Sequence, residues 1–481
     1  MSQESGHLMS STTTKKSLFV LDDGTNLMFT FILVSSLFLL WGFCNGMIDV
    51  MDKHFQEELG LNKSQSAWVQ FAHYLGSFLM SMPAGWLASK LGYKGGIIAG
   101  LLLVAVGGFW FIPATHINAQ VHAGLVSSTT AFVAFLAGVC VIASGLTFLE
   151  TIANPYTTVL GDLRFAATRI NLAQSCNGIG WILGPMVGST FFYSKNAAGQ
   201  STGSQTLYIP YVGIAIGVLV IAAIFFFANV PDIKMEDDYH LDDATPGATH
   251  SIWAQPHFAL AVAAQFFYVA AQAGIFSFFI NYMTAEVPAI PASWDAAVTN
   301  LSAHAGPLHN WLMGWFETRN GVLAITNTGA SNLQSLGLVC FLVGRFSGAG
   351  LLRRFAAHKM LGLYAVLNVA TTLLIFCKLG WLSVACVFLS YFFMSIMFPT
   401  IFALGIFGLG ARAKKASAFI VMAIMGGAIL PKLMGYVADK FDMSRGFIVP
   451  MFCFAFVAFY GFNWSRYSHA ESLHGVKPSG H

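Results

Sequence analysis

The chain has 481 residues, of which 56% are hydrophobic and only 9% are charged, with a formal net charge of +3. Soluble domains carry about 25% charged residues, so this chain has too few to cover a water-facing surface of its size. The composition excludes an ordinary soluble enzyme, a disordered protein and a nucleic-acid binder, and it predicts an all-α integral membrane protein. Because one bilayer span takes about 20 apolar residues, the chain can hold roughly twelve spans and their loops.

The apolar runs fall into two groups of six. A polar tail (1–25) precedes an N-terminal half (26–230), and an acidic linker (231–254) separates this from a C-terminal half (255–466) and a second tail (467–481). The first run is too long for the core of a signal peptide, so it predicts a true first helix. The predicted spans are about 26–51, 67–89, 95–115, 129–159, 166–193, 206–230, 256–284, 329–353, 359–379, 381–409, 415–438 and 446–465.

A long loop, residues 286–328, separates the seventh and eighth spans. In it Trp311 and Trp315 are four residues apart, so a short helix there would present both indoles on one face. Tryptophan favours the headgroup level of a bilayer, which indicates an interfacial anchor. The alternative interpretation is a lid over a path through the membrane-spanning helices.

The distribution of Lys and Arg predicts the orientation. The loops on the side of the two tails and the linker carry most of these residues. The positive-inside rule therefore predicts that both termini are cytoplasmic and that the 286–328 loop is extracytoplasmic. The acidic residues of the linker do not contradict this, because acidic residues contribute little to the rule.

The two halves resemble each other weakly. TFLETIANPYTTVLG (147–161) aligns with FMSIMFPTIFALG (393–405), so that Pro155 matches Pro399 and Gly161 matches Gly405. Related halves are typical of transporters in which two helix bundles rock around a central site.

Two carboxylates inside predicted spans are candidates for coupling transport to the movement of a proton. Glu150 lies in the middle of the fourth span with Asn154 one turn later, and Asp49 lies near the end of the first span with Asn45 one turn earlier. An ionisable group in the hydrocarbon is costly, and is therefore a functional candidate. Because a low dielectric disfavours the charged form, either carboxylate can take up and release a proton as access alternates. The alternatives are a solvated helix-end carboxylate for Asp49 and a structural ion pair for Glu150.

Amide side chains form polar stripes along several spans. Asn and Gln offer both a donor and an acceptor, as each hydroxyl of a sugar requires, and aromatic faces can stack on a pyranose. The alternative is that these amides only hydrogen-bond neighbouring helices to one another. Asn171 and Gln70 belong to the same stripes. The predicted substrate-binding residues are Trp41, Asn45, Asp49, His73, Glu150, Asn154, Gln174, Asn177, Gln265, Tyr268, Gln272 and Asn281.

Two cations also lie within predicted spans. Lys432 is a candidate charge partner for a carboxylate, or it extends to the interface. Arg345 is followed by further arginines, so we expect it near the cytoplasmic end of its helix. The sequence has no metal-binding cluster, phosphate-binding loop or nucleophile elbow, so we expect neither an enzyme nor a metal or other cofactor. Energy would come from an ion gradient or from the substrate itself.

Several segments together resemble one family of transporters. They are LFLLWGFCNGMIDVM (37–51), PAGWLASKLGYKGGIIAGL (83–101), LETIANPYTTVLG (149–161), RINLAQSCNGIG (169–180), GRFSGAGLL (344–352), MSIMFPTIFALGI (394–406) and FIVMAIMGGAILP (419–431). The chain resembles, from about residue 28 to 465, the fucose–proton symporter family of the major facilitator superfamily, which includes bacterial glucose/galactose transporters. The resemblance implies a twelve-helix fold with inverted repeats. It also implies symport of a hexose or 6-deoxyhexose such as glucose, galactose or fucose with a proton.

The resemblance assigns sugar binding and proton coupling to Asp49 and Glu150, and cavity lining to Gln174 and Asn177. Gly46 and Lys432 depart from the fucose transporter, which has Asn and Pro there, so the particular sugar stays open. Sodium-coupled or uncoupled sugar transport, and export of another polar metabolite, are the alternatives, and a membrane sensor is a more distant one. We expect a monomer in the bacterial inner membrane, with a sugar, a proton and lipid as its partners and no nucleic acid.

Overall fold

The computed structural model describes residues 18–21, 24–58, 68–192, 206–233, 251–304, 315–319, 321–471 and 473. This part of the chain is helical apart from one antiparallel hairpin and an isolated bridge between Val20 and Asn26. Ten of its helical segments are long and apolar enough to cross a membrane. The prediction of an all-α integral membrane protein is confirmed.

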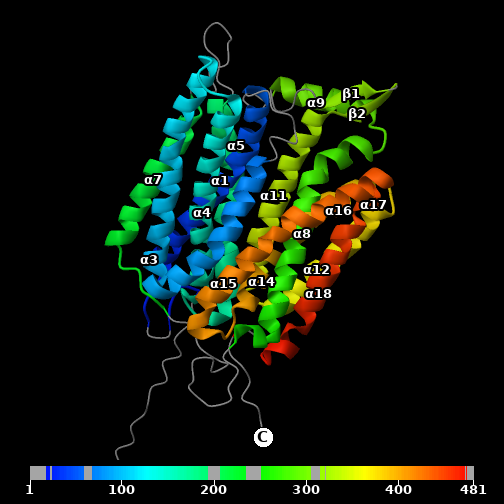
Figure 1. Cartoon of the computed structure of the whole chain (residues 1–481). Coiled ribbons are helices and arrows are strands. Elements are labelled where there is room, and N and C mark those ends of the chain that lie inside the picture. The colour runs from blue at the N-terminus through cyan, green and yellow to red at the C-terminus, as the bar shows by residue number, and fades with distance from the viewer. Residues whose placement is uncertain are drawn as a thin grey trace, which may run out of the picture.

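The N-terminal half is built around one deeply buried helix, α4. Nearly every residue of α4 from Ile142 to Val159 is buried, and small side chains such as Gly145 allow the neighbouring helices to approach closely. The helices of this half in the described residues are α1 (Met28–Glu58), α3 (Trp68–His122), α4 (Ser128–Val159), α5 (Ala166–Phe192) and α7 (Tyr208–Phe227) (Figure 1).

Helix α3 contains both the second and the third predicted span. Its backbone breaks at Gly92, where φ is 72° and ψ is −178°, a conformation that a residue with a side chain rarely adopts. A Cβ at Gly76 would lie 2.8 Å from the Cys140 carbonyl oxygen, and one at Gly107 would lie 2.7 Å from the Ile142 amide nitrogen. Positions before and after the break therefore meet the same level of α4, so the chain reverses direction at Gly92.

The C-terminal half follows the same plan, but two of its predicted spans are interrupted. The tenth is broken at Ser395 and Ile396, and the eleventh at a short 3₁₀ segment, Ala423–Met425. The helices are α8 (Pro256–Ala285), α11 (Asn327–Leu351), α12 (Ala357–Phe376), α13 (Trp381–Met394), α14 (Met397–Gly405), α15 (Ala413–Met422), α16 (Gly426–Lys440), α17 (Met443–Gly446) and α18 (Ile448–Ser468).

Each half has its own hydrophobic core. One cluster of buried side chains comes from α1, α3, α4 and α7, and another from α8 and α11 to α18. The start of α5 is the exception, because Ala166, Ala167 and Ile170 belong to the cluster of the C-terminal half. Two separately packed halves can move against each other without disrupting either core.

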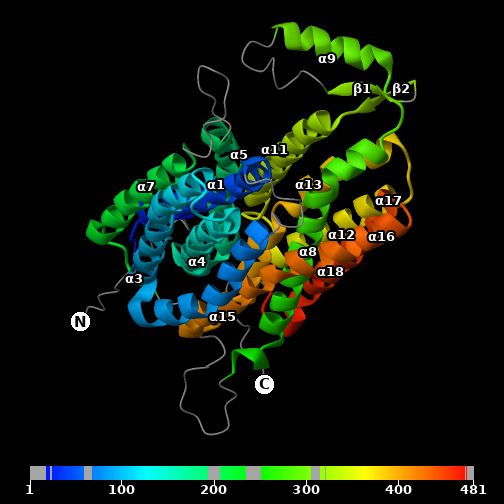
Figure 2. The same ribbon diagram turned by 45° about the horizontal axis from the view of Figure 1, so that its top comes forward.

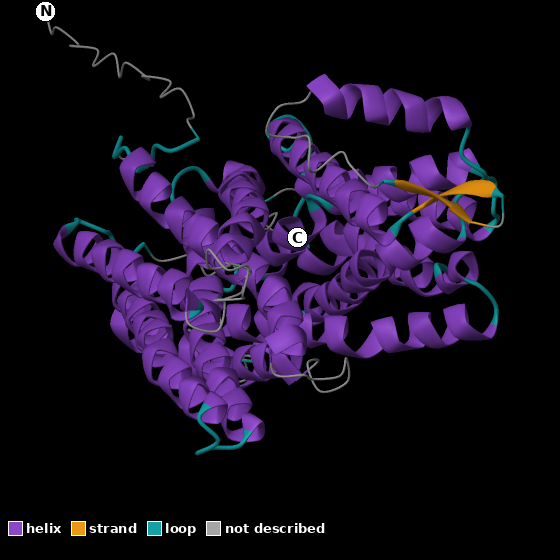
Figure 3. Ribbon diagram, turned by 90° about the horizontal axis from the view of Figure 1, so that it is seen from above, coloured by secondary structure: helices purple, strands orange, loops and turns teal. Residues whose placement is uncertain are grey.

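The two ends of the bundle are easily distinguished. We call the end that holds Pro231, Ser251 and the residues after α18 the linker end, and the opposite end the hairpin end (Figure 1). At the hairpin end, α9 (Ala292–His304) is followed by β1 (Phe316–Arg319) and β2 (Val322–Ile325), within the loop expected at 286–328. Figure 2 shows α9 and the hairpin on the side of α8 and α11. Figure 3 places the hairpin at the periphery of the molecule.

The structure does not test the tryptophan pair expected in this loop. Trp315 directly precedes β1, while Trp311 lies outside the described residues. The structured tryptophan contact is a different one, between Trp294 of α9 and Trp381 of α13, with ring centroids 4.9 Å apart. This contact holds α9 against the C-terminal half.

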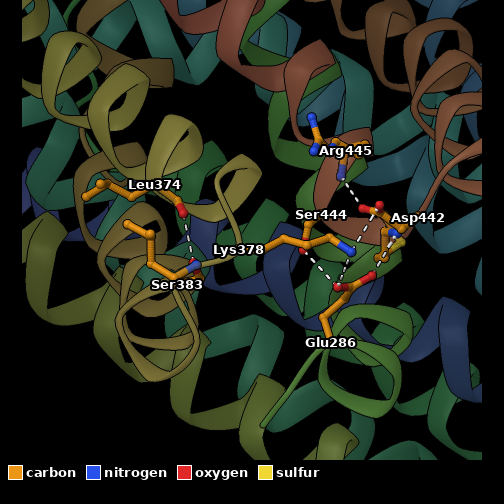
Figure 4. Close-up of polar contacts among 9 residues, drawn as sticks. Glu286, Leu374, Lys378, Ser383, Asp442, Ser444 and Arg445 are labelled. Carbon is orange, nitrogen blue, oxygen red and sulfur yellow. Dashed lines mark hydrogen bonds and ion pairs between the residues drawn. The ribbon is translucent and has the colours of Figure 1, made fainter.

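A polar network also ties three loops together at the hairpin end (Figure 4). Lys378 Nζ lies 3.2 Å from Glu286 Oε2 and 3.0 Å from Asp442 Oδ2. Glu286 Oε1 accepts a hydrogen bond from the Met443 amide, and Asp442 Oδ1 accepts one from the Arg445 amide, which caps α17. The ends of α8, α12 and α16 are thereby fixed relative to one another.

Candidate functional site

Glu150, the candidate residue for proton coupling, is buried on α4. Its residue is 4% exposed, and Asn154, one turn later on α4, is fully buried. The side-chain Nδ2 of Asn154 donates to the backbone carbonyl oxygen of Glu150 at 2.9 Å. The Oδ1 of the same side chain accepts from Gln174 Nε2 of α5 at 2.9 Å. The structure therefore brings three of the predicted site residues together.

This chain of contacts continues into the C-terminal half through Arg345 of α11. One guanidinium nitrogen of Arg345 donates to the Gln174 carbonyl oxygen at 2.7 Å, and its Nε donates to the Ser395 carbonyl oxygen at 2.9 Å. The guanidinium carbon also lies 4.6 Å from the ring centroid of Phe341. Arg345 thus links α5 of one half to the break between α13 and α14 of the other.

As expected, Arg345 lies near one end of α11, which ends at Leu351, but its side chain is buried inside the bundle. The residue is 4% exposed and its guanidinium is committed to carbonyl oxygens inside the bundle. The nearby Arg353 and Arg354 suggested the end of the span, and they are indeed exposed, but Arg345 lies two turns deeper. A lone arginine in an apolar run was the sequence signal, since such a residue needs polar partners inside the membrane.

Two prolines explain why backbone carbonyl oxygens inside the bundle are free to accept hydrogen bonds from other helices. Proline lacks an N–H and displaces the carbonyl four residues earlier. Pro399 frees the Ser395 carbonyl, which accepts from Arg345. Pro155 frees the Thr151 carbonyl, which accepts from Ser417 Oγ of α15 at 2.7 Å. The prolines that mark the internal repeat therefore each free a carbonyl oxygen that accepts a hydrogen bond from another helix.

Tyr268 and Asn171 stabilise the same boundary. Tyr268 of α8 is fully buried, and its hydroxyl donates to the Met394 carbonyl oxygen at 3.1 Å, beside the helix break. Asn171 of α5 donates to Thr400 Oγ1 of α14 at 3.1 Å, which is a second hydrogen bond from α5 to the C-terminal half. In this conformation the Tyr268 side chain supports the backbone and does not offer a free face for stacking.

Several polar atoms of the site are buried and have no hydrogen-bond partner among the described residues. They are Glu150 Oε1, Asn45 Oδ1, His73 Nδ1 and both amide atoms of Gln265. Glu150 also makes no ion pair with a described residue. An unpaired buried polar group is unfavourable by about 1–3 kcal/mol, so these atoms are suited to bind hydroxyl groups or a proton.

Helices α1 and α5 pack closely together around Asn177. Gly42 of α1 lies against the Asn177 backbone so closely that a Cβ there would overlap it, and Gly180 and Gly184 face α1 in the same way. Asn177 Nδ2 donates to the Phe38 carbonyl oxygen at 3.4 Å, a long hydrogen bond. The glycines thus explain how Asn177 of α5 comes within hydrogen-bond distance of the α1 backbone.

Other predicted site residues lie away from this network. Gln272 and Trp41 are half-buried, and Asn281 is exposed toward the hairpin end of α8. Lys432 is exposed on α16 and forms no ion pair with a described residue. Asp49 lies on α1, but its side chain is outside the described part of the structure.

The two halves also meet at the linker end. A Cβ at Gly85 of α3 would lie 2.9 Å from the Ala418 side chain of α15, and Lys414 Nζ lies 3.0 Å from Asp232 Oδ1. Toward the hairpin end, α16 diverges from the helices of the N-terminal half (Figure 1). Together with the buried polar centre, this arrangement defines a polytopic membrane transporter built from two linked helix bundles.

Known proteins are similar to the chain over nearly its full length. The Major Facilitator Superfamily profile matches residues 29–319. The L-fucose–proton symporter of Escherichia coli is 34% identical over 445 residues, covering 89% of this chain and 91% of that protein. A glucose/galactose transporter of Brucella abortus is 31% identical over 431 residues, covering 89% and 92%. A crystal structure of the transporter FucP in the outward conformation matches with a TM-score of 0.72 and 32% identity, covering 91% of this chain and 99% of that one.

The chain belongs to the major facilitator superfamily and, within it, to the family of the fucose–proton symporter and the glucose/galactose transporters. The resemblance and the twelve-helix fold that it implied are confirmed. These relatives are transporters and not enzymes, in agreement with the expectation from the sequence.

Proposed function

We propose that this protein imports a monosaccharide, a hexose or 6-deoxyhexose, together with a proton. The named activities of its relatives support this substrate class and this ion. The observation that carries the proposal is Glu150, a carboxyl group buried at the boundary of the halves without a cation among the described residues. An unpaired charge there is costly, so a proton is the natural ion for this site.

The sugar would bind next to Glu150, between α1, α4, α5 and α8. Asn45, Glu150 and Gln265 present unpaired polar atoms, and Gln265 offers both a donor and an acceptor. The Asn154–Gln174 hydrogen bond keeps the α4 and α5 side of this site in place. Asp49 is the second candidate for proton coupling, on the same helix as Asn45.

We place the linker end on the cytoplasmic side of the bacterial inner membrane. The arginines of this end, including Arg353, Arg354 and Arg412, support that orientation through the positive-inside rule. The halves are in contact at this end, so the transport site would open toward the periplasm. We expect the protein to work as a monomer without a cofactor, since each half has its own core and the site lies between them.

Uptake into proteoliposomes tests the proposal. With an inward proton gradient, labelled glucose, galactose or fucose accumulates in vesicles that contain the wild-type protein. Glu150→Gln abolishes accumulation but retains exchange of internal for external sugar, because the variant stays neutral throughout the cycle. Glu317→Gln is the matched control, since this carboxylate is exposed on β1 and pairs with Arg319. Accumulation at the wild-type rate by Glu150→Gln would refute proton coupling at this residue.

The same vesicles distinguish the remaining alternatives. A sodium gradient without a pH gradient drives uptake only if sodium is the coupling ion. Equilibration without accumulation under either gradient would identify an uncoupled facilitator. If none of the sugars enters or exchanges, the substrate is another polar metabolite and the sugar proposal is wrong.

A further inference from the structure

A basic pocket lies at the linker end, between the two halves and away from the transport site. It has a volume of about 530 Å³ and is open to the surface. One wall is Phe165, in the 3₁₀ turn before α5, and the other is the end of α11 and the turn that follows it. The lining residues are Phe165, Ser347, Gly350, Leu351, Arg353 and Arg354.

The charge of the pocket is positive. Arg353 and Arg354 are exposed, and neither forms an ion pair with a residue that the structure describes. Arg164 adds a third guanidinium, stacked 4.7 Å from the ring centroid of Phe165. Asp162 offsets this charge only in part, because its carboxylate lies 3.9 Å from Arg164. Guanidinium groups bind phosphate oxygens through paired hydrogen bonds.

The surroundings of the pocket are apolar. Leu351 is 36% exposed and Phe355 is 56% exposed, next to the two arginines. Exposed apolar side chains beside unpaired arginines, at the end of membrane-spanning helices, match the boundary between lipid headgroups and acyl chains. A soluble phosphate would use only the arginines, whereas a phospholipid would contact both kinds of side chain.

We propose that this pocket binds the phosphate headgroup of an anionic phospholipid, with Arg353 and Arg354 as its ligands. Because Phe165 belongs to one half and the arginines to the other, the lipid contacts both halves while they are closed at the linker end. It therefore stabilises this state relative to the state in which the halves separate there. The site is independent of the sugar and of the coupling ion.

Thermal unfolding in lipid nanodiscs tests the proposal. Adding phosphatidylglycerol to phosphatidylcholine nanodiscs raises the unfolding midpoint of the wild-type protein by about 2 °C or more, and high salt removes the effect. The double variant Arg353→Gln, Arg354→Gln loses this shift. The double variant Lys359→Gln, Lys415→Gln keeps it, because it removes the same charge from exposed residues outside the pocket.

Further arms separate the sources of phosphate and guard against misfolding. Inorganic phosphate, added to protein in phosphatidylcholine alone, changes the unfolding midpoint little. If it raised the midpoint as much as phosphatidylglycerol does, the ligand of the pocket would be a soluble phosphate and the lipid proposal would be wrong. Ser347→Glu places a carboxylate in the pocket and also loses the lipid response, without removing an arginine. The proposal is overturned if phosphatidylglycerol has no effect on the wild type, or if the arginine variant responds as the wild type does.

Discussion

Lys414 of α15 and Asp232, at the start of the linker, form an ion pair, with Lys414 Nζ 3.0 Å from Asp232 Oδ1. The same ammonium lies 4.2 Å from the ring centroid of Tyr93, and the Tyr93 amide donates to Asp232 Oδ1 at 3.3 Å. Gly92 lies against the Asp232 carboxylate, because a Cβ at Gly92 would be only 3.0 Å from Asp232 Oδ2. The backbone reversal in α3, the start of the linker and α15 therefore meet at one point, which must separate when the halves rock.

Asp232→Asn weakens this contact and favours the state open at the linker end. Asp232 is half-exposed, so we expect an effect of about 0.2–1 kcal/mol, which is at most about a fivefold change in the ratio of states. Spin labels at Leu125 and Val322, in a background with the exposed Cys377 replaced by Ser, report the separation of the halves at the hairpin end. The population with the shorter distance increases in the variant.

Asp439→Asn is the control for this experiment, because Asp439 is an exposed carboxylate on α16 without a described ion pair. If Asp232→Asn and Asp439→Asn give the same distance distribution, the ion pair does not contribute to the balance of states.

Arg345→Lys separates the charge of the buried cation from its geometry. The guanidinium reaches the Gln174 and Ser395 carbonyl oxygens at once, whereas an ammonium is a point charge on a flexible stem. We expect the loss of one charged hydrogen bond, about 1.5–3 kcal/mol, with a lower unfolding temperature and slower transport. Arg466→Lys, on an exposed position of α18, leaves both unchanged. An unaltered unfolding temperature in Arg345→Lys would exclude a bridging role.

Gln265→Leu tests whether the unpaired amide belongs to the sugar site. Both polar atoms of Gln265 are buried without a described partner, so replacing the amide by an apolar group of similar size does not reduce the unfolding temperature. If the amide binds a sugar hydroxyl, KM rises about tenfold or more, which corresponds to about 1.4 kcal/mol.

Gln334→Leu is the opposite case, because Gln334 Nε2 donates to the Phe276 carbonyl oxygen at 2.9 Å. This variant loses stability and leaves KM near the wild-type value. A Gln265→Leu protein that is destabilised but has normal KM would show that this amide is structural.

The network at the hairpin end gives a dependence of stability on pH. The hydrogen bond to Asp442, and then the contact with Glu286, raise the pKa of Lys378 above its ordinary value of 10.5. Burial raises the pKa of Asp442, but the hydrogen bonds from the Arg445 amide and from Lys378 outweigh it, and the net pKa lies below 3.8. The contribution of Lys378 to the stability of the fold is present below pH 10.5. It is lost as pH rises through the higher pKa that Lys378 has in the folded protein. The Asp442 contribution is present above pH 3.8 and is lost as pH falls through the lower folded pKa.

Lys378→Asn removes the charge and can keep the backbone conformation of this position. Lys378 has a positive φ of 56°, which Asn tolerates better than most residues. We expect the variant to lose about 0.2–1 kcal/mol of folding free energy at neutral pH. It should show no further loss of stability as pH rises above 10.5. Thermal unfolding at several pH values measures both effects. Lys440→Asn, exposed at the end of α16, is the control. A variant that still loses stability in that alkaline range as the wild type does would contradict this account.

The sequence alone determined the kind of protein and the helices. Apolar runs of bilayer length, separated by charged loops, leave few alternatives to a membrane-spanning bundle, because every backbone polar group in lipid must be paired within a helix. The rarity of charge inside those runs also made Glu150 stand out. The pairing of Pro155 with Pro399 was visible as a weak repeat.

Only the tertiary structure decided what these residues touch. The carbonyls that the two prolines free could be satisfied by any nearby donor, and the fold supplies Ser417 and Arg345 from helices distant in sequence. Amphipathic spacing could not show that Arg345 bridges α5 and the break between α13 and α14, nor that Tyr268 is committed to a backbone carbonyl while Gln265 is not. Side-chain periodicity gives the face of a helix, but the neighbour of that face is set by how the two halves pack together.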